Sequence, residues 1–326
     1  MLWHKVQGAG GAGGGGGATY YGSRGVFGGG AESYASVNKI DYITIATTGN
    51  AADFGDMTVT AELRGACSNG SRGVFGGGYQ SSASAGTNTI DYVTIATTGN
   101  ATDFGDLTVA RYGTAACSNG TRGVFGGGIV YSSGQTAFEV NTIDYVTIAT
   151  TGNATDFGDL TEVRRGLSAC SNGTRGVFGG GYRLDIASDR NTIDYITIAT
   201  TGNATDFGDL TVARRSLSAC SNGTRGVFGG GLIGISPSTG SNVMDYVTIA
   251  TTGNATDFGD LTVTRYGPGA CSDGTRGVFG GGAIPATKST TYYNTIDYVT
   301  ISTTGNATDF GDLTAQRSNV SATSGS

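Results

Sequence analysis

Side chains able to carry out acid–base, metal or nucleophilic chemistry are few in this sequence, and most of them recur at one fixed position. The single histidine, His4, lies in the N-terminal segment. His-ligated copper and zinc sites, and Ser-His-Asp or Cys–His nucleophiles, need histidine beside groups from other parts of a fold. We therefore expect neither a His-ligated metal nor a histidine-activated nucleophile in the remainder of the chain.

Paired carboxylates are the second candidate. The motif Asp-Phe-Gly-Asp occurs in every repeat, for example at Asp206 and Asp209, and such pairs could bind calcium or hydrolyse a glycoside. A calcium loop, however, supplies more oxygen ligands within about a dozen residues, and a pair present in every repeat does not single out one catalytic site. We expect these aspartates to hold turns and a nearby arginine such as Arg214, and we predict no catalytic residue, metal site or cofactor.

Five cysteines suggest a ring of thiols, because they occupy one equivalent position: Cys67, Cys117, Cys170, Cys220 and Cys271. Thr323 takes the sixth such position. A disulfide needs Cα atoms within about 7 Å of each other, which equivalent positions on separate units do not offer. We expect small buried side chains with free thiols, packed between neighbouring units.

A repeat of about fifty residues must position all these groups. The sequence Arg-Gly-Val-Phe-Gly-Gly-Gly begins six times, at spacings of 48, 50, 53, 50 and 51 residues: Arg24, Arg72, Arg122, Arg175, Arg225 and Arg276. Repeats of this length bury their faces against their neighbours. The 326 residues are therefore expected to form one domain, although length alone suggests two.

The segment from Asn191 to Gly231 predicts four strands. Asn191–Thr200 alternates β-branched and aromatic residues, and Asp206–Thr211 is a shorter strand whose glycine indicates a bend or bulge. Ser216–Ser221, made of small side chains, and Thr224–Gly231 follow after turns containing Gly and Asn. Four short antiparallel strands per unit are typical of a β-propeller blade.

From Ser23 to Ser326 the repeat resembles the Kelch repeat. In each copy a Gly-Gly pair closes one strand. It is followed by a Tyr-bearing strand, then an aromatic strand, and then an Arg before a strand of small residues. The resemblance implies that the small-residue strand lies innermost around the axis and that Asp206–Thr211 lies outermost. Kelch repeats usually carry Trp on the outer strand. Here phenylalanine stands in its place, a conservative change for packing between blades: Phe54, Phe104, Phe157, Phe207, Phe258 and Phe310.

The spacing of the repeats predicts that the ring is closed. Each Ile-Asp-Tyr (Met-Asp-Tyr in one copy) starts 32 residues before the next Arg-Gly-Val-Phe, and the last one, at Ile296, would place its Arg just past the C-terminus. Ser23 and Arg24 supply the missing positions, so residues 318–324 are expected to complete blade 1 beside Arg24–Gly30. We predict an all-β, six-bladed β-propeller of residues 23–326, with four antiparallel strands per blade and a Gly-rich tail of residues 1–22.

Differences between the copies fall into two segments. One, of 9 to 14 residues, follows Gly-Gly-Gly, and the other follows Asp-Leu-Thr. In an antiparallel blade both connections emerge on the same side, which we call the varied face. Tyr and Arg are common energetic anchors of interfaces, and Tyr amid Ser and Gly is typical of paratopes. We predict a binding role for ten residues: Tyr34, Tyr79, Tyr112, Tyr131, Phe138, Tyr182, Arg183, Tyr266, Tyr292 and Tyr293. The alternative is that these loops vary because nothing constrains them.

The net charge of −6 argues against binding to nucleic acid or to anionic membranes. No segment approaches the roughly 20 apolar residues that cross a bilayer, and the N-terminus lacks the apolar core of a secretory signal. Residues 8–18 contain only Gly and Ala, and Leu2, Trp3 and Val6 precede them. We interpret the tail as an attachment device, the alternative being a disordered terminus.

Near-identical Kelch-like repeats with a Gly-rich leash are similar to virion proteins of tailed phages, especially marine ones. The resemblance implies a non-enzymatic virion appendage, a tail- or capsid-attached adhesin. Its tail would bind other virion proteins, and its varied face would contact a host surface glycan or protein. The alternative is a cytoplasmic Kelch-type scaffold for protein interactions. A glycan-active enzyme is a third hypothesis, which the absent catalytic groups disfavour.

Overall fold

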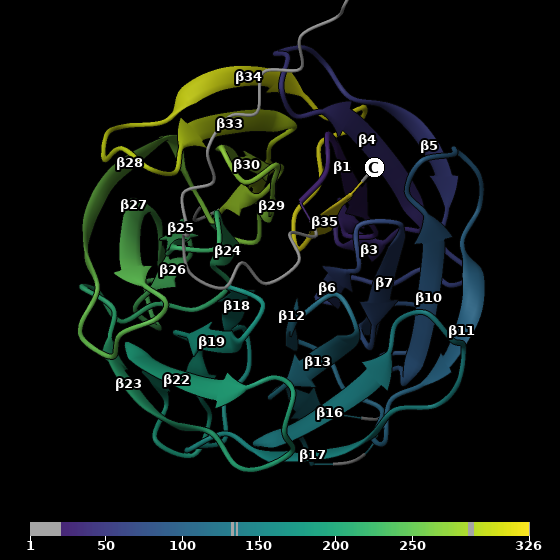
Figure 1. The fold of residues 1–326 in the computed structure, drawn as a ribbon, viewed down its shortest axis with the longest axis vertical. Coiled ribbons are helices and arrows are strands. Elements are labelled where there is room, and N and C mark those ends of the chain that lie inside the picture. The colour runs from purple at the N-terminus through teal and green to yellow at the C-terminus, as the bar shows by residue number, and fades with distance from the viewer. Residues whose placement is uncertain (1–20, 132–133, 135, 286–289, 326) are drawn as a thin grey trace, which may run out of the picture.

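Six antiparallel β-sheets surround a central axis in the computed structural model, which describes residues 21–131, 134, 136–285 and 290–325 (Figure 1). The described residues contain no helix. Each sheet is a blade whose order, from the axis outward, is a small-residue strand, the Arg-Gly-Val-Phe-Gly strand, the Asp-Tyr strand and the Asp-Phe-Gly-Asp strand. The protein is therefore a six-bladed β-propeller, as the sequence predicted.

Blades 1 to 3 are formed, from the inside outward, by β35 (Ser321–Gly325), β1 (Arg24–Gly28), β4 (Lys39–Thr44) and β5 (Ala52–Asp56); by β6 (Gly65–Ser68), β7 (Arg72–Gly76), β10 (Thr89–Thr94) and β11 (Thr102–Asp106); and by β12 (Ala115–Ser118), β13 (Arg122–Gly126), β16 (Thr142–Thr147) and β17 (Thr155–Asp159).

Blades 4 to 6 are formed, in the same order, by β18 (Ser168–Ser171), β19 (Arg175–Gly179), β22 (Thr192–Thr197) and β23 (Thr205–Asp209); by β24 (Ser218–Ser221), β25 (Arg225–Gly229), β27 (Thr239–Thr248) and β28 (Thr256–Arg265); and by β29 (Gly269–Ser272), β30 (Arg276–Gly280), β33 (Thr295–Thr300) and β34 (Thr308–Asp312).

Short hairpins extend the connection between the second and third strands of the blades. They are β2 (Ala31–Glu32) with β3 (Ala35–Ser36), β8 (Tyr79–Gln80) with β9 (Ala85–Gly86), β14 (Ile129–Val130) with β15 (Phe138–Glu139), β20 (Tyr182–Arg183) with β21 (Ser188–Asp189), and β31 (Ala283–Ile284) with β32 (Thr291–Tyr292). In blade 5 the short strand β26 (Leu232–Ile233) pairs with an extended β27 instead.

The two ends of the described chain share blade 1. Strand β35 pairs with β1 in antiparallel register from Arg24 opposite Gly325 to Gly28 opposite Ser321. Figure 1 shows the yellow C-terminal strand beside the purple β1. The inner edge of β1 is thereby paired, which confirms the predicted closure.

A sequence unit and a structural blade are offset from each other. The predicted unit from Asn191 to Gly231 contributes β22 and β23 to blade 4, and β24 and β25 to blade 5. The chain leaves each blade at its outer strand and enters the next blade at the axis. One covalent connection therefore ties every pair of neighbouring blades.

Side-chain chemistry accounts for the strands and turns. In β22, Ile193 and Ile196 are buried and Thr197 is exposed. In the turn before β25, Asn222 Oδ1 accepts hydrogen bonds from the backbone N–H groups of Thr224 and Arg225 at 3.0 and 2.8 Å, and Gly223 takes φ 80°. The predicted bulge is present where the β22–β23 register shifts between Ile193 and Asp194.

The hydrophobic core lies between blades. In one of its clusters Phe207 and Leu210 of blade 4 pack with Phe228, Val247 and Ile249 of blade 5. The Phe207 ring also meets the ring of Tyr195 edge to face, with centroids 6.0 Å apart. Full burial of a phenylalanine side chain contributes about 1.5–3 kcal/mol. The packing of Phe207 against residues of blade 5, which recurs at the other junctions, therefore holds adjacent blades together.

A buried ion pair was missed by the sequence analysis. Arg214 pairs at 2.9 Å with Asp245 of the following Met-Asp-Tyr, and not with Asp206 or Asp209; Thr211 Oγ1 donates to the same carboxylate. Equivalent pairs of 2.6–2.9 Å occur at every blade junction: Arg64–Asp91, Arg111–Asp144, Arg164–Asp194, Arg214–Asp245, Arg265–Asp297 and Arg317–Asp41.

The Asp-Phe-Gly-Asp aspartates have a different role from the one expected. The backbone N–H of Asp209 donates to Asn254 Oδ1 of the next blade at 3.1 Å, and its carbonyl accepts from Ala255 N at 2.8 Å. Asp206 is exposed. The motif therefore joins outer strands through its backbone.

The inner strands form two layers of contact around the axis. Six serine hydroxyls each donate to the carbonyl of the equivalent serine in the preceding blade, at 2.6–2.8 Å: Ser68, Ser118, Ser171, Ser221, Ser272 and Ser324. The five cysteines are free and buried. Their sulfurs lie against a glycine of the next blade, as Cys170 does against Gly226, which confirms the expected packing between blades.

Candidate binding surface

The two variable segments of each repeat lie on one side of the disc. Antiparallel pairing sends the Ser-Asn-Gly and Thr-Thr-Gly-Asn turns to one face and both variable connections to the other. Backbone bridges then join the two connections within a blade, for example Tyr112 to Ile129 and Arg165 to Tyr182. Two loops that are far apart within each repeat thus form one continuous surface.

The varied face is held by a belt of backbone hydrogen bonds around the axis. Gly113 N donates to Leu63 O at 2.9 Å, and Gly166 N donates to Gly113 O at 2.8 Å. Leu63 N in turn donates to Asn319 O at 3.1 Å, which continues the belt across the chain ends. The connections are therefore fixed relative to one another before any ligand binds.

A hollow of about 300 Å³ opens on this face, and we call it the tyrosine hollow. Its size is at the lower end of the range for small-molecule sites. Its walls come from blades 1, 2, 3 and 6 and consist of Ala31, Tyr34, Glu62, Leu63, Tyr79, Tyr112, Tyr266, Tyr292, Ser318 and Asn319.

Four of the five tyrosines are packed as two pairs. Tyr34 and Tyr292 meet edge to face with ring centroids 5.8 Å apart, and Tyr34 N donates to the Tyr292 hydroxyl at 3.0 Å. Tyr79 and Tyr112 meet at 5.0 Å with tilted rings. Aromatic pairs at these separations favour defined ring orientations, so the walls of the hollow are preorganised.

Backbone strain positions part of the wall. The turn between β2 and β3 has two central residues, Ser33 and Tyr34, with φ of 46° and 70°. Both values fit the tight hairpin turn that normally takes Gly or Asn. Leu63 and Asn319 also have positive φ, at 58° and 55°. Non-glycine residues in this region cost free energy and are concentrated at functional sites.

Glu62 is the one carboxylate among the described residues of the wall. Its residue is 8% exposed, and Asn319 Nδ2 donates to its Oε2 at 2.6 Å. Burial raises the pKa of Glu62, while hydrogen bonds from Asn319 and Ser36 lower it, with a net rise. The chain thus keeps a carboxylate in an environment that disfavours its charge.

Burial also governs the tyrosine hydroxyls. It raises the pKa of Tyr266 to about 12. Burial likewise raises the pKa of Tyr112, against the opposing charge of Arg165. A hydrogen bond from Thr290 has the opposite effect on exposed Tyr34 and lowers its pKa. The phenols of Tyr112 and Tyr266 are therefore neutral at pH 7.

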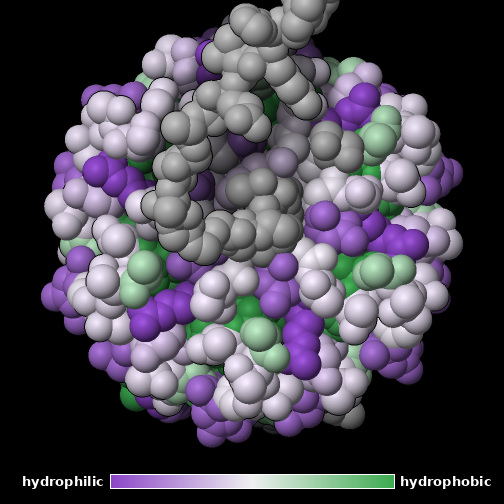
Figure 2. Space-filling model, viewed as in Figure 1, coloured by the Kyte–Doolittle hydropathy of each residue, from purple (hydrophilic) through white to green (hydrophobic). Residues whose placement is uncertain are grey.

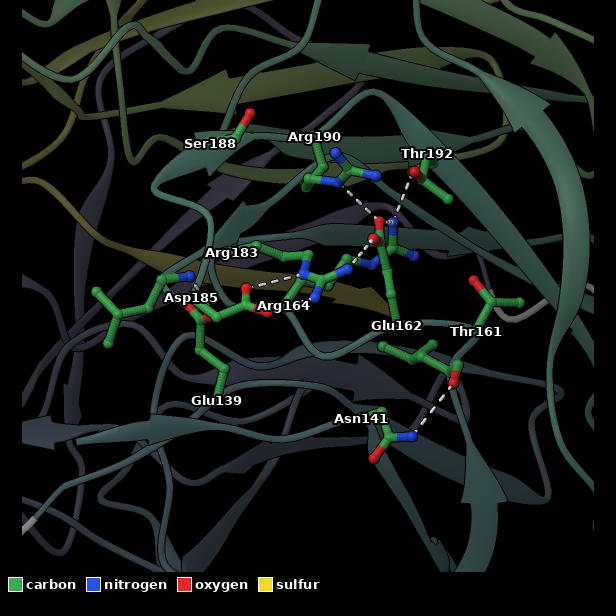
Figure 3. Close-up of polar contacts among 12 residues, drawn as sticks. Glu139, Asn141, Thr161, Glu162, Arg164, Arg183, Asp185, Ser188, Arg190 and Thr192 are labelled. Carbon is green, nitrogen blue, oxygen red and sulfur yellow. Dashed lines mark hydrogen bonds and ion pairs between the residues drawn. The ribbon is translucent and has the colours of Figure 1, made fainter. Parts of the chain in front are cut away.

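The opposite side of the varied face is charged rather than aromatic. Figure 3 shows Glu162 pointing toward Arg183 and Arg190, with contacts of 3.4 Å and 3.0 Å. Arg183 also pairs with Asp185 at 2.5 Å. Glu162 also lies 3.8 Å from the buried side chain of Arg164. The hydrogen bond from Arg190 and the nearby guanidiniums outweigh burial and lower the pKa of Glu162.

Two arginines lie over the ring of one tyrosine in this charged cluster. The guanidiniums of Arg165 and Arg215 lie 5.2 and 5.0 Å from the ring centroid of Tyr182. Arg165 pairs with Glu139 at 3.2 Å, and Arg215 pairs with Asp189. These charges are matched within the protein, whereas Glu62 in the tyrosine hollow is in no ion pair of the described residues.

The structure thus distributes the ten predicted binding residues over several places. Five line the tyrosine hollow: Tyr34, Tyr79, Tyr112, Tyr266 and Tyr292. Tyr182 and Arg183 belong to the charged cluster. Three lie elsewhere: Tyr131 is close enough to Tyr112 to affect its pKa, Phe138 is 55% exposed in β15, and Tyr293 bonds through its backbone to Gly282. Leu2, Trp3 and Val6 lie outside the described residues.

Glu62, Leu63 and Asn319 were missed by the sequence analysis. The bridges that they or their neighbours make show that Glu62 is equivalent to Tyr112 and Tyr266. A signal was present, because this copy has Ala61-Glu62-Leu63 where all five other copies begin with Arg, followed by Tyr-Gly, Arg-Gly, Arg-Ser or Ser-Asn. A copy that breaks an otherwise uniform motif is a candidate for function.

On the face that Figure 2 shows, hydrophilic side chains are spread over the described part, and apolar surface appears there only in small patches. Among described residues, no group of three or more His, Cys, Asp or Glu is placed to hold a metal ion, and no helix could span a membrane. No protein-family model matches the sequence, and no curated protein is significantly similar to it.

Proposed function

We propose that this protein is a non-enzymatic, virion-associated adhesin that binds a host surface glycan or protein through its varied face. The observation that carries the proposal is the tyrosine hollow. Five tyrosines from four blades meet around one opening, whereas equivalent positions elsewhere on this face hold the paired charges of Arg165 and Arg215.

Tyrosine suits such a role physically. Its ring supplies a large apolar contact at low cost in side-chain entropy, and its hydroxyl can bond to a polar ligand. A rigid ring of blades carrying variable loops is also a general arrangement for binding proteins, because the loops change without affecting the core. The belt of backbone hydrogen bonds supports preorganisation, which reduces the entropy lost on binding.

The virion assignment rests on sequence resemblance. The Kelch-like repeats and the Gly-rich segment are similar to virion proteins of tailed phages. Residues 1–22 would attach to other virion proteins, which leaves the propeller free to reach the host. In the alternative, a cytoplasmic scaffold, the same hollow would bind an intracellular protein.

The first experiment tests attachment. Virus particles are assembled with the full chain or with a chain lacking residues 1–22, and each purified particle is assayed for the propeller. We expect the full chain on the particle and the shortened chain, folded by circular dichroism, in the unbound fraction. Equal incorporation of both would remove the tail from the proposal, and absence of the full chain from particles would favour the scaffold.

The second experiment tests the hollow. Host cells are titrated with labelled protein carrying Tyr112→Ala and Tyr266→Ala, with Ile235→Ala as an exposed apolar control outside the hollow. We expect the double variant to bind at least about tenfold more weakly and the control to bind like the parent. Unchanged binding by a folded double variant would exclude the tyrosine hollow as the site.

A further inference from the structure

The tyrosine hollow has an electrostatic character that narrows its ligand, an argument that rests on the proposed binding role of this face. Among the ten described residues that line it, Glu62 alone carries a formal charge, and none of the ten is Lys, Arg or His. The faces of its tyrosine rings are the negative side of the ring quadrupole. The hollow therefore favours a cation over a neutral or anionic group.

The absence of an ion pair at Glu62 is unusual for this protein. Each of the three other glutamates pairs with Lys or Arg: Glu32 with Lys39, Glu139 with Arg165, and Glu162 with Arg183 and Arg190. Glu62 is in none of the ion pairs of the described residues, although it is 8% exposed. Buried carboxylates normally have a charged partner, so a bound cation would complete this site.

The hydrogen-bonding state of the wall selects the type of cation. Glu62 Oε2 already accepts a hydrogen bond from Asn319. The Tyr292 hydroxyl accepts one from Tyr34 N, and the Tyr34 hydroxyl accepts one from Thr290 N. A primary ammonium has three N–H donors that each need an acceptor. A quaternary ammonium has none, and it binds to aromatic faces and a nearby carboxylate without them.

We propose that the tyrosine hollow binds a quaternary ammonium group of the choline type, carried by the host surface glycan. The rings of Tyr79 and Tyr112 on one side and of Tyr34, Tyr266 and Tyr292 on the other would surround the trimethylammonium group. Glu62 supplies the balancing charge. The charged cluster on the other side of the face, whose ion pairs are already matched, is left for the rest of the glycan.

Three small probes distinguish charge from shape and from donor count. Full-length protein is titrated by calorimetry with choline, with its neutral isostere in which a tert-butyl group replaces trimethylammonium, and with ethanolamine. We expect choline to bind at least about tenfold more tightly than either. Equal affinity for choline and the isostere would show that the positive charge is not recognised. Tighter binding of ethanolamine than of choline would show that the site does not select a quaternary ammonium. No binding of choline would overturn the proposal as a whole.

Two variants assign the effect to the hollow. Glu62→Gln removes the charge and keeps an oxygen that can accept from Asn319. Tyr112→Leu removes one aromatic ring and leaves an apolar side chain in its place. Ile235→Ala, which removes a 51%-exposed apolar side chain outside the hollow, serves as the control. We expect the first two to lose at least about tenfold in choline affinity and the control to lose none. Full choline affinity in folded Glu62→Gln would contradict the role of this carboxylate.

The results also separate this inference from the adhesin proposal. Cell binding that depends on Tyr112 and Tyr266 but is not inhibited by choline would leave the adhesin standing and overturn the ammonium ligand. Choline binding by a protein that binds neither host cells nor particles would leave the ammonium site standing and overturn the adhesin proposal.

Discussion

Nη2 of Arg317 lies 2.7 Å from Oδ2 of Asp41, although 276 positions separate the two residues. Both side chains are buried, and Thr314 Oγ1 donates to the second carboxylate oxygen at 2.6 Å. The pair joins the segment after blade 6 to the third strand of blade 1. Closure therefore depends on a buried ion pair as well as on β35.

Replacing Arg317 with Met should destabilise the ring by about 3–5 kcal/mol, because the Asp41 charge is then left buried without a partner. The free energy of unfolding in urea measures the effect. The double variant Arg317→Met, Asp41→Leu should recover much of the loss, since it removes both charges.

The equivalent change Arg164→Met provides the control, because Arg164 pairs with Asp194 in the middle of the chain. It leaves the same kind of charge unpaired in blade 4, where the inner strand β18 continues along the chain into β19, whereas in blade 1 β35 and β1 are joined only by pairing. A loss under about 1 kcal/mol for Arg317→Met would contradict the importance of the pair.

The fold could be predicted because the copies are nearly identical. A constant spacing of 32 residues fixed the strand order and the shared blade. The partner of Arg214 could not be predicted, because Asp245 belongs to the next blade and only the offset between repeat and blade brings them together. The tyrosine hollow depends on loop conformations such as positive φ at Ser33 and Tyr34, which the residue types there do not favour.

Removing residues 318–326 should abolish the cooperative fold or convert the protein into an oligomer. Without β35 the inner edge of β1 exposes unpaired N–H and C=O groups, and an unpaired edge invites pairing with another chain. Light scattering after gel filtration measures the mass. A monomer with the parent's unfolding temperature would contradict closure by this strand.

The five thiols should be unreactive in the folded protein. All are buried, and burial raises the pKa of Cys67 and of Cys170 to about 12, so the reactive thiolate is scarce at pH 8. An aromatic disulfide reagent should label no thiol of the native chain and all five after unfolding in guanidinium. Rapid labelling of one native thiol would show that an inner strand opens locally.

Ser216→Gly should stabilise the protein by up to about 1 kcal/mol, because a left-handed conformation is costly for a residue with a Cβ. Ser216 has φ 53°, and glycine stands at the equivalent positions 113, 166 and 267, with φ of 69°, 63° and 63°. The reciprocal change Gly166→Ser should destabilise by a similar amount. Thermal unfolding of both variants tests the pair, and a stabilising Gly166→Ser would refute the strain at this position.

Glu62→Gln should stabilise the free protein at neutral pH, and the benefit should disappear in acid. Burial is the main cause of the raised pKa of Glu62 in the folded state. A carboxyl with a raised folded pKa contributes its stability below its unfolded pKa and loses it as the pH rises through the folded pKa. The parent therefore bears a cost at pH 7 that glutamine, which can still accept from Asn319, avoids.

Unfolding temperatures of parent and Glu62→Gln between pH 4 and pH 8 measure this difference, with Glu162→Gln as the control. Arg183 and Arg190 pair with Glu162, and the hydrogen bond from Arg190 helps to lower its pKa against burial, so its replacement should destabilise at neutral pH instead. A residue retained against stability is expected where binding needs it. Saturating choline should then stabilise the parent and have little effect on Glu62→Gln, because only the parent offers the cation a carboxylate. Equal stabilisation of both proteins by choline would separate the buried charge from binding.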